Sequence, residues 1–130
     1  MGVRKEARLD DGADAEADGI AILHVSEPAT IASLTLLAVD PGGREFELTL
    51  AVGQPYEVSA DEWACPVKLD GLHERLRDQH GVDSWQALKL AQQLIARLLG
   101  TFIQDGGKLF WLDERNPVAL EELFVTLALE

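Results

Sequence analysis

The sequence is poor in several residue types, and each shortage narrows what the protein can be. It has a single cysteine, Cys65, so no disulfide can form within the chain and an oxidising compartment is not implied. Only 11 Lys and Arg residues stand against 23 Asp and Glu residues, and the formal net charge is −12. Binding to a phosphate backbone depends on Lys and Arg, so we expect no nucleic-acid partner.

Long apolar runs are missing as well. No stretch approaches the about 18 apolar residues that a membrane-spanning helix needs. The first residues also lack the apolar centre of a secretory signal. We therefore expect no membrane association and a cytoplasmic location, where the acidity keeps the protein dispersed or attracts a basic partner.

The apolar content is high enough for a hydrophobic core. Apolar residues make up 47% of the 130 residues, a length typical of one domain. Residues 1–19 are the exception, because they consist almost entirely of Ala, Asp, Glu, Gly and a few basic residues. We predict that residues 1–19 form a flexible acidic arm and that residues 20–130 form a single α+β domain.

One long helix is predicted over residues 84–104. Asp83 is suited to cap its first turn, and Gln86 three residues later completes a capping-box pattern. Asp105 followed by two glycines supplies the stop. Apolar side chains at helical spacing form one broad face: Leu88, Ala91, Ile95, Leu98, Leu99 and Phe102. The polar stripe opposite is narrow, so this helix should form much of the core.

Alternating patterns predict an antiparallel sheet before the helix. Residues 31–40 and 45–53 read as a hairpin joined by a Pro-Gly-Gly-Arg turn, and the second segment alternates apolar and polar residues. Residues 62–69 read as a third strand, in which Pro66 indicates an edge position or a bulge. Residues 72–80 are assigned to a fourth strand, with a helical turn as the competing interpretation.

Three shorter segments flank these elements. Residues 20–26 (IAILHVS) predict a short strand, and whether it joins the sheet is left open. Residues 108–112 are predicted as a short strand or extended segment. Asn116 and Pro117 are suited to begin a C-terminal helix. The predicted fold class is therefore α+β: an antiparallel four-stranded meander sheet with one long helix packed across one face, plus a short C-terminal helix.

Three motifs resemble those of a known family. The Trp-x-Cys-Pro segment at 63–66, the GVDSxQALxLA segment at 81–91 and the Leu-x-Trp-Leu segment at 109–112 are similar to those of a small bacterial domain family of unknown function. The resemblance covers roughly residues 31–112. It implies a shared fold, and it implies no activity and no site residues.

Few residues suggest chemistry. Cys65, His73 and His80 are the only soft metal ligands in the central region, but their spacing lacks the CxxC or HxxxH pairing of a zinc site. A Cys-His nucleophile pair requires an exposed thiol, whereas Cys65 alternates with apolar residues on one face. We therefore predict no catalytic residues, no metal and no cofactor, with a small-ligand-binding or metal-binding protein or enzyme that uses the Cys65/His73/His80 region as the alternative.

The leading functional hypothesis is a non-enzymatic protein-interaction module, such as an acidic adaptor or an immunity-like protein. Its partner would be a basic protein, with self-association as a further alternative. The candidate interaction surface is an apolar stripe on the predicted C-terminal helix, made of Leu120, Phe124 and Leu127.

Overall fold

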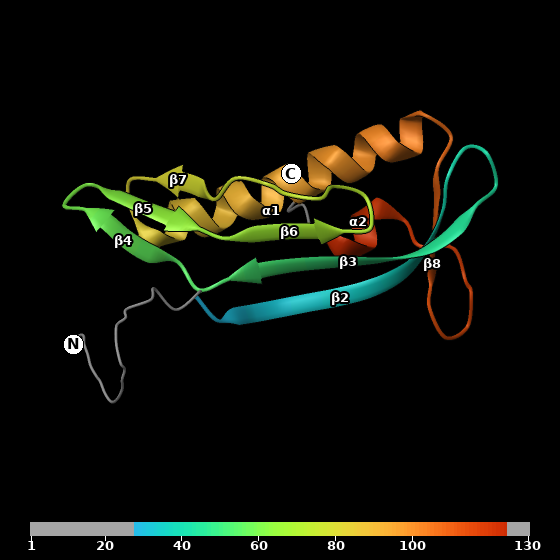
Figure 1. Ribbon diagram of the computed structural model, residues 1–130, viewed down its shortest axis with the longest axis horizontal. Helices are drawn as coiled ribbons and strands as arrows, with labels where there is room; N and C mark the ends of the chain where they lie inside the picture. The colour runs from blue at the N-terminus through green and yellow to red at the C-terminus, as the bar shows by residue number, and fades with distance from the viewer. Residues whose placement is uncertain (1–27, 125–130) are drawn as a thin grey trace, which may run out of the picture.

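The computed structural model of the chain describes residues 28–124. The predicted arm at 1–19, the predicted strand at 20–26 and Leu127 lie outside the described residues. Within them the fold class is confirmed: an antiparallel four-stranded sheet carries one long helix and a short C-terminal helix (Figure 1).

The four-stranded sheet is built around the predicted hairpin. β2 (Thr30–Val39) and β3 (Glu45–Gly53) pair antiparallel, and β6 (Val67–Asp70) pairs with the other side of β3. β8 (Lys108–Trp111) pairs with β2, which gives the order β6-β3-β2-β8. The helix-facing side chains of these strands form the centre of the core: Leu36, Ala38, Leu48, Leu50, Val52, Val67, Leu69 and Leu109.

A second sheet of three strands adjoins the first. It contains β4 (Tyr56–Ser59), β5 (Glu62–Cys65) and β7 (Gln79–Gly81), in the order β4-β5-β7. The predicted third strand is therefore two strands, because Pro66 interrupts it and lacks a backbone donor. Its two halves, β5 and β6, belong to different sheets.

The predicted fourth strand at 72–80 is wrong. Gly71 adopts a φ of 108°, and the amides of Leu72 and His73 both donate to the carbonyl of Leu69, so the chain turns back sharply after β6. Leu72 and Leu76 pack against the core with a spacing of four, and only β7 at the end of the segment is a strand. β8, predicted as a short strand or extended segment, completes the four-stranded sheet instead.

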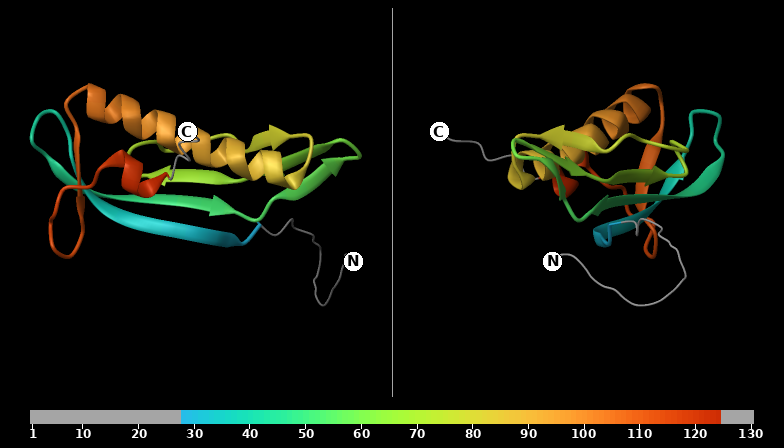
Figure 2. Two further views of the ribbon diagram at one scale, coloured as in Figure 1. Left: turned by 180° about the vertical axis from the view of Figure 1, so that it is seen from behind. Right: turned by 60° about the vertical axis from the view of Figure 1, so that its left-hand side comes forward.

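α1 (Ser84–Gln104) has the predicted bounds and lies along one face of the sheet, as both views in Figure 2 show. The carboxylate of Asp83 accepts from the amide of Gln86 at 2.8 Å, and the Gln86 side chain accepts from the amide of Val82 at 2.7 Å. At the other end the amides of Gly106 and Gly107 donate to Ile103 and Phe102 in a Schellman arrangement. The capping residues read from the sequence therefore set both ends.

The C-terminal helix begins later than predicted. α2 (Leu120–Leu123) has Ala119 as its N-cap, not Asn116. The reason is that residues 116–118 pair with β8: the Trp111 amide donates to Asn116 at 2.8 Å, and the Val118 amide donates to Leu109 at 2.9 Å. This extended pairing holds Pro117 out of the helix. Neither described helix is long and apolar enough to cross a membrane.

Candidate functional site

Cys65 is the last residue of β5, and its side chain is fully buried in the core. Its Sγ donates to the carbonyl of Gly53 at 3.3 Å, and burial raises the pKa of the thiol above its ordinary value. A nucleophilic cysteine requires the opposite setting, with partial exposure and a lowered pKa. Cys65 acts as a small core residue.

The two histidines do not converge on this thiol. His80 pairs across the strands with Ala64, so it lies on the opposite face of the small sheet from Cys65, where its Nδ1 contacts the Glu62 carboxylate at 2.6 Å. His73 lies beyond the end of β6, bridged to Leu69. Within residues 28–124, no group of three or more His, Cys, Asp and Glu side chains could hold a metal ion.

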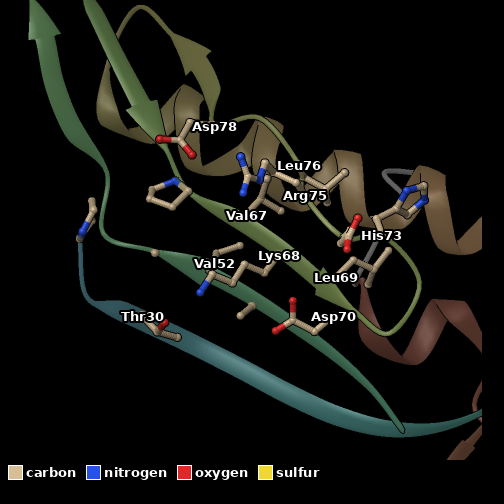
Figure 3. A pocket seen from close by; sticks show the side chains of 15 residues that line it. Thr30, Val52, Val67, Lys68, Leu69, Asp70, His73, Arg75, Leu76 and Asp78 are labelled. Atoms are coloured by element: carbon tan, nitrogen blue, oxygen red, sulfur yellow. The ribbon is translucent and has the colours of Figure 1, made fainter. Parts of the chain in front are cut away.

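A cavity of about 630 Å³ extends from segment 72–78 across β6 and the end of β3 to Thr30 at the start of β2 (Figure 3). Lys68 and Asp70 from β6 and Glu74, Arg75 and Asp78 from the segment that runs back past β6 give its lining charges of both signs. The Tyr56 hydroxyl donates to the Asp78 carboxylate, and this bond raises the pKa of Tyr56 to about 12. Segment 72–78 thus covers a charged sheet edge, and the mixed lining favours no single class of ligand.

The opposite flank of the sheet is open over half the length of β2. β8 pairs only with Leu36 to Val39, so residues 30–35 have β3 on one side and no partner among the described residues on the other. Leu109 and Trp111 of β8 pair outward with residues 116–118, so Phe110 and Lys108 are the β8 residues whose backbone groups face β2. These lie opposite Leu37 and Val39.

Because backbone groups alternate in direction along a strand, the amides of Ser33 and Thr35 point to the same side as those of Leu37 and Val39. That side is the open edge. The open stretch reads TIASLT and contains no charge, proline or glycine, and Ile31 is 52% exposed. Among the described residues, the devices that prevent pairing with another strand are missing from this edge, except for a β-bulge at its start, between Thr30 and Ala32.

An apolar groove of about 190 Å³ lies beside this edge. Its floor comes from β2 and β3, one wall from α1, and its end from α2. The residues are Ala32, Ser33, Leu34, Leu50, Ala51, Val52, Gln92, Ile95, Leu123 and Phe124. We call this feature the β2 groove. A strand added to the open edge would direct every second side chain into it.

Two of the three residues predicted as an interaction stripe can be placed. Phe124 is half-buried and lines the β2 groove. Leu120 packs toward α1, with its Cδ2 3.9 Å from the position that a Cβ would take at Gly100, and belongs to the core's periphery. Both residues pack against the core, and Phe124 in addition lines the groove.

Trp85 is the most exposed large apolar side chain among the described residues, at 80%. Trp85, Leu88 and Gln92 are spaced by three and four residues, so they follow one side of α1, the side that carries the groove wall. Sequence reasoning did not identify residues 30–35 as an open sheet edge. Two signals of an exposed surface were available in the sequence. Trp85 lies outside the apolar face of the helix, and the strand at residues 30–39 is uncharged and longer than β8, its partner on that side.

Comparison with known families supplies a classification. No curated protein and no solved structure matches the chain. The sequence model of DUF6968, a domain of unknown function, matches residues 35–121, from the middle of β2 to the first turn of α2. The match covers well over half of the sequence and most of the secondary structure described above. The chain therefore belongs to the DUF6968 family.

Proposed function

We propose that this protein is a non-enzymatic interaction module that binds an extended segment of a partner protein along the open edge of β2. One observation carries the proposal: residues 30–35 are uncharged, have no partner strand on one side among the described residues, and lie directly beside an apolar groove. Sheet edges that lie next to a groove recognise peptides by strand addition, in which main-chain hydrogen bonds supply affinity and alternate side chains supply specificity.

The geometry of the edge and the groove supports a particular kind of ligand. The amides and carbonyls of Ser33 and Thr35 are the groups that an added strand would bond. Alternate side chains of that strand would rest on Leu34 and against Ile95 and Phe124. The groove is small, so it suits one or two aliphatic side chains rather than a large aromatic ligand.

Charge favours a basic partner. The net charge is −12, and Glu121 and Glu122 of α2 lie next to the groove residues Leu123 and Phe124. Lys or Arg beside the apolar positions of the ligand would be attracted to this end, and high salt would weaken that attraction. The partner is therefore an extended segment with alternating aliphatic residues, flanked by basic residues.

The test is a selection of displayed random peptides of about ten residues, the upper end of ordinary strand length, on the immobilised full chain. Enriched peptides are then measured against two variants. Ser33→Pro removes an amide that faces the open edge, a position where a strand tolerates proline, whereas Ser33→Val keeps the amide. We expect Ser33→Pro to weaken binding at least about tenfold and Ser33→Val to bind as wild type.

Two results would overturn the proposal. One is the failure to enrich any peptide whose binding depends on the Ser33 amide. The other is a stable dimer at micromolar concentration that Ser33→Pro dissociates, because the edge would then serve a second copy of this chain instead of another protein.

A further inference from the structure

The open edge of β2 begins where the described part of the chain begins. The amide of Gln54 donates to the carbonyl of Ala29 at 2.8 Å, which fixes the start of β2 beside the end of β3. Residues 20–26 (IAILHVS) are joined to this point by residues 27–29 alone, and that connection contains Pro28. A connection of three to five residues is the length that joins two antiparallel neighbours.

The lengths and compositions of the two segments match. Residues 21–26 supply six positions, and the open stretch of β2 at 30–35 has six. Residues 20–26 contain no Asp, Glu, Lys or Arg, although acidic residues crowd the sequence before them and Glu27 follows them. An apolar, β-branched segment in such surroundings is typical of a strand that packs against another element.

The alternation also fits the groove. In one register Ile20, Ile22 and His24 would face the β2 groove, and in the register shifted by one residue Ala21, Leu23 and Val25 would do so. Either set places aliphatic side chains over Leu34 and against Ile95 and Phe124. No Asp, Glu, Lys or Arg side chain enters the groove in either register.

We infer that residues 20–26 form an antiparallel strand on the open edge of β2 and occupy the β2 groove when no partner is bound. The short connection gives this segment a millimolar effective concentration at the edge, so a partner must displace it. The displacement rests on the proposed function, whereas the docking of residues 20–26 stands without it. The apparent affinity for a partner equals the intrinsic affinity multiplied by the fraction of chains in which the edge is free.

The test uses the full chain and hydrogen exchange of individual amides followed by NMR. Docking predicts slow exchange at Ser33 and Thr35 in the wild type. The double variant Ile22→Asp/Leu23→Asp disables both registers, and we expect exchange at these two amides to accelerate at least about tenfold. The amides of Leu34 and Leu36, which face β3, should keep their protection. Ala13→Asp/Ala15→Asp adds the same charge outside the segment and should behave as wild type.

Rapid exchange at Ser33 and Thr35 in the wild type, equal to that in Ile22→Asp/Leu23→Asp, would overturn the inference and leave the proposed function intact. A second readout separates the two claims. Displayed peptides selected on the double variant should bind it at least about tenfold more tightly than they bind the wild type. If the exchange result holds but the double variant enriches no peptide, residues 20–26 are a permanent strand of the fold and the proposed function fails.

Discussion

The two flanks of the four-stranded sheet differ in how well their edges are protected from pairing with another strand. β6 is four residues long, carries Lys68 and Asp70, and is covered by segment 72–78. Residues 30–35 of β2 are longer and uncharged, and no described residue covers them. Short length, charge and a covering segment are the devices by which proteins prevent unwanted strand pairing. All three are present on the β6 flank, whereas the described residues provide none of them along residues 30–35 of β2, and this contrast supports the proposal that the β2 edge binds another strand.

The difference between the flanks depends on particular residues, so substitution can break it. The covered flank relies on the turn at Gly71, whose φ is 108°. A Cβ at this position would lie 2.5 Å from the carbonyl oxygen of Glu47. Gly71→Ala combines backbone strain with a clash against backbone, and we expect it to lower the free energy of unfolding by about 3 kcal/mol in urea denaturation.

Gly43→Ala is the matched control, because Gly43 has a φ of 93° but no atom within 4 Å of the Cβ position. It carries only the strain of positive φ, about 1 kcal/mol. Equal losses in the two variants would show that the clash at Gly71 contributes nothing.

The stability of α1, which packs against the sheet, should depend on its N-cap. Asp83→Ala removes the carboxylate that accepts from the Gln86 amide, which should destabilise the fold by about 1 kcal/mol. Asp83→Asn keeps an accepting oxygen and should stay within a few tenths of a kcal/mol of wild type. Thermal unfolding measures both, and a loss in Asp83→Asn as large as in Asp83→Ala would contradict a capping role.

A charged side chain should protect the open edge of β2 against strand pairing, as it does on β6. Ile31→Lys places a lysine on the open edge, as Lys68 stands on β6. Because Ile31 is exposed, we expect the free energy of unfolding to change by no more than about 0.5 kcal/mol. Peptides selected on the wild type should nevertheless bind this variant at least about tenfold more weakly in a titration. Unchanged affinity would place the binding surface elsewhere.

The smallest effect concerns the contact of Tyr56 with the covered flank. Tyr56 is the only tyrosine, so phenolate absorbance reports its pKa directly, and the hydrogen bond to Asp78 should give a value of about 12. The folded-state pKa lies above the ordinary value of 10.0, so this bond stabilises the protein below about pH 10 and is lost as pH rises toward 12. Asp78→Asn should lower the tyrosine pKa toward 10, and no shift would contradict the contact.

Local signals predicted most of the fold. Asp83 and the glycines after Asp105 set the ends of α1 to the residue, and the hairpin of β2 and β3 followed from alternation and its turn. Partners distant in sequence were harder to predict. Pro66 marked an interruption without telling which sheet each half joins, and the leucines at 72 and 76 suit a strand or a packed turn equally well.

The candidate site was only partly predictable for a similar reason. Phe124 belonged to a visible apolar stripe, and it lines the β2 groove. The open edge is invisible in the sequence, because it exists only where β8 is shorter than β2 and where residues 116–118 pair with β8 rather than with β2.

The most direct test of the central claim adds a saturating selected peptide to the Ile22→Asp/Leu23→Asp variant and follows amide exchange along β2. Strand addition predicts an alternating result: exchange slows at Ser33 and Thr35 and is unchanged at Leu34 and Leu36, which already pair with β3. A bound peptide that leaves Ser33 and Thr35 exchanging as before would contradict the account, because the open edge of β2 would then not be its binding site.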